Sequence, residues 1–334
     1  MAKRTSFNDE LARLKRIARD RAPEDGDVAA VRKALGGANA LLVAKAAEAA
    51  SRAHFEDLLP ELAEALDRFM KKGAKEDKGC TGKTALTEAL DALHYEHHEP
   101  FLRGIRYVQL EPGFGEQTDT AARLRSVCAA ALVRTGRRED ILVELTTLLV
   151  DGEAEPRRVA AQNLGFAVPS EASELVLRLK VLTGDESPEV LGDCFTSLLH
   201  LAPQRSFDFV AGYLAGHDPD VAQAAAIALA QSQDRQRALA LLIERFEKAF
   251  SGEFQEALLT AIALVRIPLA IDFLARILAH ENSHLAAAAI RAMAIYRTDE
   301  QVKSRAQNAV LARGLPLLQE EFTRSFDVAA RLRD

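Results

Sequence analysis

One helical pattern returns along most of the chain at an almost constant interval. Segments rich in alanine and other small residues recur, and one small or apolar position aligns in each of them: Ala129, Ala161, Cys194, Ala225, Leu258 and Ala289. The steps between these positions are 32, 33, 31, 33 and 31 residues. Such spacing is typical of helical hairpins stacked one on the next, because only a turn then tolerates an insertion. We therefore expect an all-α fold, a right-handed α-solenoid of about eight helical hairpins.

Helices of a second kind lie between the small-residue segments and carry larger apolar side chains on one face. Residues 138–151, 235–250 and 268–280 place leucine, isoleucine or phenylalanine at helical spacing, which is typical of an amphipathic helix. The chain has no tryptophan and only 4 tyrosines among 334 residues, so its helices are expected to meet through small side chains. Each hairpin should pair an outer amphipathic helix with an inner small-residue helix.

The turns before the small-residue helices share a capping motif. Asp218 stands before Pro219, and Val221 follows; an aspartate N-cap with proline at the first helical position is a common helix start. With the small residues after it, this motif resembles the HEAT repeats, including the bilin-lyase HEAT-like repeats, over about residues 120–298. The resemblance extends more loosely upstream through Leu86 and Ala46, with steps of about 40 residues. It implies paired A and B helices, with the B helices lining a concave face.

Three parts are expected along the chain. Residues 1–37 should form a helical N-terminal cap from a basic helix and a short second helix, residues 38–298 the HEAT-like solenoid, and residues 299–334 a helical C-terminal cap. The end repeats of a solenoid need a polar outer face, and both ends of this chain are rich in charged residues.

Composition bounds the compartment and the partners. The net charge of −6 argues against a dedicated nucleic-acid binder, which usually has a basic excess. The basic N-terminus lacks the apolar stretch of a signal peptide, and no run reaches the ~18 apolar residues of a membrane span. Cys80, Cys128 and Cys194 form neither an even disulfide set nor a CxxC pair. We expect a cytoplasmic protein with no membrane partner and no cofactor, and the sequence leaves the oligomeric state open.

The string GCTGKT from Gly79 to Thr84 ends like a phosphate-binding P-loop. That loop requires G-x-x-x-x-G-K-[ST] between a β-strand and a helix. Here Asp77 stands in place of the first glycine, where its carboxylate would repel phosphate, and the residues before it have a helical, charged pattern. The string is therefore expected to form an A-to-B turn, with a helix start near Thr81 or Thr84.

A histidine-rich stretch offers a second candidate site. His94 and His98 stand at i, i+4, a spacing that could place both imidazoles on one helical face for a metal ion. The stretch falls where one hairpin gives way to the next, however, so the helix is expected to end within it. A HEAT-like di-iron hydroxylase would repeat His-Glu pairs across several hairpins, whereas this chain has only His98-Glu99 and His280-Glu281. A polar turn between repeats is favoured over a metal site.

The longest A-to-B turn is expected at residues 110–119. Long turns in compact domains are often functional, and successive A-to-B turns of a solenoid lie along one edge, so this turn should neighbour those at 77–84 and 155–158. The rim so formed would gather a mixed set of charged and aromatic residues: Lys78, Lys83, Glu111, Phe114, Glu116, Asp119, Arg123, Arg125, Arg157 and Arg158. Two interpretations stay open: a protein-recognition surface, where arginine and aromatic residues are favoured, or a ladder of ion pairs that ties successive repeats together.

No arrangement of nucleophile and base points to catalysis, so no catalytic residue is assigned. The favoured function is an interaction scaffold that binds a protein or peptide partner on its concave face and its A-to-B turn rim. One alternative is an enzyme, in the manner of the bilin-lyase HEAT-like proteins or with a metal at His94 and His98. The other is nucleic-acid binding, as in HEAT-like alkylpurine DNA glycosylases, which depend on a basic groove and aromatic residues.

Overall fold

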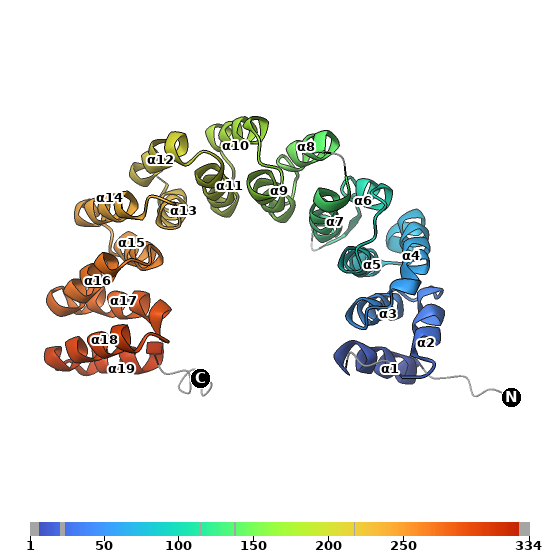
Figure 1. The fold of residues 1–334 in the computed structure, drawn as a ribbon, viewed down its shortest axis with the longest axis horizontal. Coiled ribbons are helices and arrows are strands. Elements are labelled where there is room, and N and C mark those ends of the chain that lie inside the picture. The colour runs from blue at the N-terminus through green and yellow to red at the C-terminus, as the bar shows by residue number, and fades with distance from the viewer. Residues whose placement is uncertain (1–6, 21–23, 114, 137, 217, 327–334) are drawn as a thin grey trace. The chain divides into compact units, whose positions relative to one another are not determined.

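The computed structural model describes residues 7–20, 24–113, 115–136, 138–216 and 218–326. The chain divides into two compact units, Met1–Val168 and Pro169–Asp334. In both units the helices form two rows, and each row takes every second helix along the sequence (Figure 1).

The odd-numbered helices form one row in each unit, and each contacts the next odd-numbered helix of its own unit. In the first unit the row consists of α1 (Phe7–Asp20), α3 (Ala40–Arg52), α5 (Thr81–Ala92), α7 (Ala122–Thr135) and α9 (Ala154–Phe166). In the second it consists of α11 (Pro188–Leu201), α13 (Pro219–Ala230), α15 (Gly252–Leu264), α17 (Ser283–Met293) and α19 (Pro316–Phe326).

The even-numbered helices form the second row, and each contacts the odd-numbered helix that follows it. In the first unit these are α2 (Asp27–Leu35), α4 (Leu59–Lys72), α6 (Glu99–Gly104) and α8 (Arg138–Leu148). In the second they are α10 (Glu171–Thr183), α12 (Pro203–Ala211), α14 (Arg235–Lys248), α16 (Pro268–His280) and α18 (Glu300–Arg313). Short 3-10 turns supplement them: η1 (Glu56–Leu58), η2 (Gly73–Lys75), η3 (Lys78–Cys80), η4 (Gly212–Ala215) and η5 (Ala294–Tyr296). The expected α-solenoid of paired helices is confirmed.

Small side chains explain the close packing of the odd-numbered row. All the aligned repeat positions, from Ala129 to Ala289, lie in this row and are fully buried. The same principle acts between rows at Gly104 of α6, where an added Cβ would fall on the sulfur of Cys128 in α7. Interiors packed to crystal-like density tolerate no such extra atom without a shift of their neighbours. The periodic small residues therefore set how closely the helices approach.

The expected capping motif forms at the start of α13. The Asp218 carboxylate accepts hydrogen bonds from the backbone N–H groups of Asp220 at 2.9 Å and Val221 at 3.2 Å. Pro219 occupies the first turn, where its missing N–H leaves no helical hydrogen bond unmade. These contacts satisfy donors that would otherwise be orphaned at the helix end.

Two helices lie in the N-terminal segment, where a basic helix and a short second helix were expected: α1 and α2. Asp27 in α2 is completely buried and accepts hydrogen bonds from Arg13 and Arg16 of α1. α1 contacts α3, whereas α2 contacts α3 and α4 in the manner of an outer helix. The division into two caps and a central array stays a prediction.

The repeat interval is longer near the N-terminus because two A-to-B turns contain extra residues. One turn is residues 73–80, with two 3-10 turns, and the other is a β-hairpin between α6 and α7. Strands β1 (Leu110–Pro112) and β2 (Gln117–Asp119) pair antiparallel, with Glu111 opposite Thr118. The long turn expected at residues 110–119 is therefore present, and it contains a short β-hairpin that the sequence analysis did not predict.

Candidate functional site

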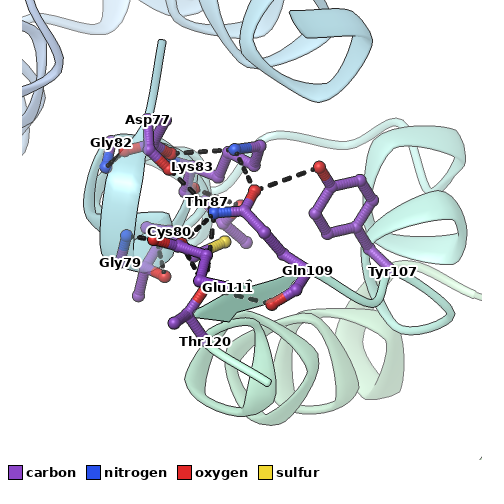
Figure 2. A network of polar contacts seen from close by, with 11 residues as sticks. Asp77, Gly79, Cys80, Gly82, Lys83, Thr87, Tyr107, Gln109, Glu111 and Thr120 are labelled. Carbon is purple, nitrogen blue, oxygen red and sulfur yellow. Dashed lines mark hydrogen bonds and ion pairs between the residues drawn. The ribbon is translucent and has the colours of Figure 1, made fainter. Parts of the chain in front are cut away.

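The β-hairpin is fastened to the preceding repeat through one carboxylate oxygen. Glu111 Oε1 accepts hydrogen bonds from the backbone N–H of Gly79, from Gln109 Nε2 and from the Thr120 hydroxyl, each at 2.7 Å (Figure 2). These hydrogen bonds lower the pKa of Glu111, Thr120 and Gln109 having the largest effect, and keep the carboxylate charged. The hairpin is thereby joined to the turn that precedes α5.

A buried ion pair lies at the start of α5. Asp77 accepts hydrogen bonds from the backbone N–H groups of Gly82 at 2.8 Å and Lys83 at 3.0 Å, and Lys83 Nζ lies 3.1 Å from Asp77 Oδ2. Neither side chain is exposed. In a P-loop, helix N-terminal N–H groups and a lysine hold a phosphate. Here the chain's own carboxylate takes that position, and the expected A-to-B turn with a helix start at Thr81 is confirmed.

Gln109 joins the ion pair to the hairpin. Its Oε1 accepts a hydrogen bond from Lys83 Nζ at 2.8 Å, and its Nε2 donates to the Asp77 carbonyl at 2.8 Å. The Tyr107 hydroxyl donates to the same Oε1 at 3.2 Å, and Figure 2 shows the ring beside the lysine. We call Asp77, Lys83, Gln109 and Glu111 the anchor network. A buried polar network with its hydrogen bonds made holds its surroundings rigidly, so the hairpin has a fixed base.

A second set of contacts continues from the hairpin into the next turn. Arg125 is buried; its guanidinium donates to Asp119 Oδ2 at 2.6 Å and to both oxygens of Asp151 at 2.7 Å. Burial alone would raise the pKa of Asp119, but the N–H groups of Ala121 and Gln109 and the guanidinium of Arg125 lower it. The buried Arg157 donates to the carbonyls of Asp151 and Gly152. Three successive turns are thus tied together, as the ladder interpretation expected.

The structure sorts the rim residues into two groups. Lys83, Arg125 and Arg157 are buried, and Glu111 and Asp119 are partly buried; all five belong to the contacts that hold the turns. Exposed residues of the rim are Lys78, Glu116, Arg123 and Arg158. Phe114 lies outside the described residues.

Arg123 forms a bridge on the exposed side of the odd-numbered row. Its guanidinium lies 3.2 Å from Glu88 of α5 and 3.1 Å from Glu155 of α9. Because the arginine side chain is 62% exposed, water screens these pairs and each contributes little to stability.

Sequence reasoning missed the apolar residues that the hairpin exposes. Val108 is 57% exposed and Leu110 is 54% exposed, and Pro112 is exposed as well. Gln109 and Glu111 alternate with them and belong to the anchor network. The signal was present in the strand-like alternation of apolar and polar residues from 108 to 112.

The histidine candidates do not share a helix. α5 ends at Ala92, His94 has a positive φ of 57°, and α6 begins only at Glu99. The helix was expected to end within this stretch and instead ends just before it, so the i, i+4 face that would join His94 and His98 does not form. In the part of the chain that the structure describes, no group of three His, Cys, Asp or Glu side chains is placed to hold a metal ion.

The three cysteines are buried and unpaired. Burial raises the pKa of Cys80 and of Cys194 to about 12, and raises that of Cys128 as well. A thiol must lose its proton to act as a nucleophile, so these side chains behave as small apolar groups. Among the described helices, none has both the length and the apolar character that crossing a membrane requires.

Comparison with known proteins supports the fold. Residues 175–263 match a family model described as HEAT repeats, which confirms the resemblance seen in the sequence. The chain superposes on the karyopherin Kap121p, in a crystal structure bound to the SUMO protease Ulp1p, with a TM-score of 0.50 at 13% identity. The match covers 99% of this chain and 41% of that karyopherin, so this chain spans about two fifths of its length.

Two further solved structures are similar over almost all of this chain. An engineered protein is 16% identical with a TM-score of 0.37, the match covering 98% of this chain and 96% of that one. A multiply substituted Kap121p is 14% identical with a TM-score of 0.43, over 99% of this chain and 45% of that one. No curated protein matches the chain by sequence.

Proposed function

We propose that this HEAT-repeat α-solenoid is an interaction scaffold that binds a protein or peptide partner. The partner contacts the A-to-B turn rim at the β-hairpin and extends onto the face of the neighbouring odd-numbered helices. The observation that carries the proposal is that the β-hairpin has both a rigid base and an apolar exposed side. The anchor network fixes the hairpin, while Val108 and Leu110 remain more than half exposed.

The energetics of the anchor network favour a functional hairpin. Burying an ion pair such as Asp77–Lys83 removes two charges from water, a cost that the mutual attraction often only balances. A short turn in place of the whole network would avoid that cost. The network does, however, hold the hairpin as a fixed, preorganised surface, and such a surface loses less conformational freedom when it binds a partner.

The composition of the exposed rim fits protein recognition. Apolar side chains at the centre of an interface contribute most when a polar rim surrounds them. Val108, Leu110 and Pro112 supply the apolar part, and the other exposed rim residues are charged: Lys78, Glu116, Arg123 and Arg158. Kap121p, which shares the fold, was crystallised bound to a protein, and this supports the general class of partner. A cytosolic location agrees with the unpaired cysteines and stays a prediction.

The proposal is tested by quantitative affinity purification of the full chain from its native host at mild salt. The variant is Val108→Asp/Leu110→Asp, which places two charges on the apolar side of the hairpin without touching the anchor network. We expect at least one protein that copurifies with the wild type to be lost with this variant.

The matched control is Val143→Asp/Val150→Asp, which changes two valines near α8 that are 64% and 74% exposed. We expect it to retain the partners of the wild type. Recovery of the same proteins in the same amounts with both variants would show that the hairpin is not a binding surface.

A further inference from the structure

The register of the β-hairpin determines which backbone groups of β1 point away from β2. The Gly113 N–H donates to the Glu116 carbonyl at 2.9 Å, and the Thr120 N–H donates to the Gln109 carbonyl at 2.9 Å. Along an antiparallel pair of strands, residues that bond to the partner strand alternate with residues that do not. Leu110 directly follows Gln109, so its N–H and C=O point the other way, to the outer edge of β1.

This outer edge has open hydrogen-bonding groups. Among the residues that the structure describes, neither the N–H nor the C=O of Leu110 has a hydrogen-bond partner. Backbone groups that lie buried without a partner are rare in proteins, and Leu110 is 54% exposed, so its groups are open to water. Pro112 lies on the same edge and presents its C=O but no N–H. The edge therefore offers a donor and an acceptor at Leu110 and a further acceptor at Pro112.

The side chains of β1 divide between two faces. Gln109 and Glu111 both contact Thr120 and lie on the side of the anchor network (Figure 2). Leu110 and Pro112 alternate with them and are exposed. Neighbouring strands bring their side chains into contact on each face of a sheet. A strand added at the outer edge of β1 would therefore cover Leu110 with a side chain of its own.

The open backbone groups decide what kind of segment fits. A helix uses its own N–H and C=O groups internally and cannot pair with those of Leu110. An extended segment presents both groups at alternate residues and can add to the edge of a sheet. The outer edge of β2 suits such a segment less, because its residues Gln117 and Asp119 are polar, and polar or charged side chains protect edge strands from pairing.

The small size of the edge argues against a second copy of the chain as the occupant. A stable dimer buries roughly 800 Å² on each partner. A strand of 3 residues supplies far less than that area. A short extended segment, by contrast, can be held by the hydrogen bonds of one edge together with a few side-chain contacts.

We propose that the partner binds through an extended segment that adds to the outer edge of β1 as a third strand, with apolar side chains at alternate positions against Leu110. This inference rests on the proposed function, because it specifies how the partner contacts the same hairpin. Backbone hydrogen bonds at Leu110 set the register, and burial of apolar side chains adds affinity. The anchor network already holds β1 in place, so the edge needs little ordering when the segment binds.

The test is fluorescence anisotropy with the full chain and a labelled peptide of about six residues in which valine and threonine alternate. A second peptide has the same side chains but carries an N-methyl group on every central amide, which removes the hydrogen-bond donors of both its edges. We expect the first peptide to bind at least about tenfold more tightly than the methylated one.

Proline variants distinguish the two edges of the hairpin. Leu110→Pro removes the outward N–H of β1 and should weaken binding of the unmethylated peptide by about tenfold. Leu110→Val keeps that N–H and an apolar side chain, and its affinity should stay within about twofold of the wild type. Gln117→Pro removes the outward N–H of β2 and should leave binding unchanged. The Thr120 amide, which donates within the hairpin, should remain protected from hydrogen exchange in every variant.

Three results overturn the proposal: no binding of the unmethylated peptide, equal affinity for both peptides, or equal losses for Leu110→Pro and Gln117→Pro. Analytical ultracentrifugation gives an independent check. A concentration-dependent dimer that Leu110→Pro abolishes would make the occupant a second copy of the chain instead.

Affinity purification separates this proposal from the proposed function. Partners that are lost with Val108→Asp/Leu110→Asp but kept with Leu110→Pro would leave the hairpin as a binding surface and exclude strand addition. Partners that are kept with Val108→Asp/Leu110→Asp would contradict the proposed function itself.

Discussion

Lys83 Nζ lies 3.1 Å from Asp77 Oδ2, and both side chains are completely shielded from solvent. The pair closes the N-terminus of α5, and through Gln109 it reaches the base of the β-hairpin. Two features that the sequence suggested separately, a P-loop-like string and a long turn, are therefore one structure. The string holds an internal carboxylate, and the turn is a hairpin resting on that assembly.

The ion pair should be strongly coupled. Lys83→Met leaves the Asp77 carboxylate buried without its cation, so the free energy of unfolding should fall by about 3–5 kcal/mol. Asp77→Asn/Lys83→Met removes both charges and retains one helix cap, and it should recover a large part of that loss. Urea denaturation of the wild type, the two single variants and the double variant measures the coupling. Additive losses would contradict a direct pair.

Arg125 and Arg123 differ by two positions and should differ greatly in effect. Arg125 is 4% exposed between Asp119 and Asp151, so Arg125→Ala leaves two carboxylates without their cation and should cost about 3 kcal/mol. Arg123 is 62% exposed, and Arg123→Ala should cost at most about 1 kcal/mol. Thermal and urea denaturation compare the two variants. Similar losses for both would mean that Arg125 does not hold the turns together.

Acid should loosen the hairpin before it unfolds the helices. The pKa values of Glu111 and Asp119 are both lowered from their ordinary values of 4.5 and 3.8. Groups with a lowered folded pKa stabilise fully above the ordinary value, and this stabilisation is lost as the pH falls through the folded value. Hydrogen exchange of the amides in residues 109–120, corrected for intrinsic rates, should show protection at pH 6 and less at pH 3. Glu111→Gln should reduce the difference; an unchanged profile would argue against an anchoring carboxylate.

Close packing of α6 on α7 can be tested at Gly104. An alanine Cβ there would overlap the Cys128 sulfur, and overpacking of this kind typically costs about 1–3 kcal/mol. Gly104→Ala/Cys128→Ala removes the sulfur and should restore part of the loss. The control is Gly152→Ala, because an added Cβ at Gly152 meets nothing within 4 Å. The melting temperatures of the three variants test whether α6 packs closely on α7 at this position. Equal stability of the single Gly104 variant and the control would contradict the close approach.

The repeat could be predicted from sequence because its determinants are local and periodic. A small residue such as Ala161 or Ala225 every 31–33 residues signals a helix that must approach its neighbours closely. Capping at Asp218 depends only on the next three residues. Because each helical hairpin uses the same arrangement, the pattern recurs along the chain and can be recognised in the sequence.

The site depends on contacts between residues far apart in sequence, which no local pattern encodes. Glu111 reaches the backbone of Gly79, 32 positions earlier, and this contact helps to turn a long loop into a hairpin. Lys83 and Arg125 were expected at the surface because charged residues are rarely buried without partners. The sequence contains those partners, Asp77 for Lys83 and Asp119 and Asp151 for Arg125. It does not show that the fold brings them together.

The central claim is that the exposed side of the hairpin contacts a partner. It is tested most directly by photo-crosslinking in the native host, with a photoreactive amino acid in place of Leu110 and, as the control, in place of Val143. We predict a discrete crosslinked protein from position 110 that position 143 does not give. No crosslink from position 110, or the same products from both positions, would contradict the account.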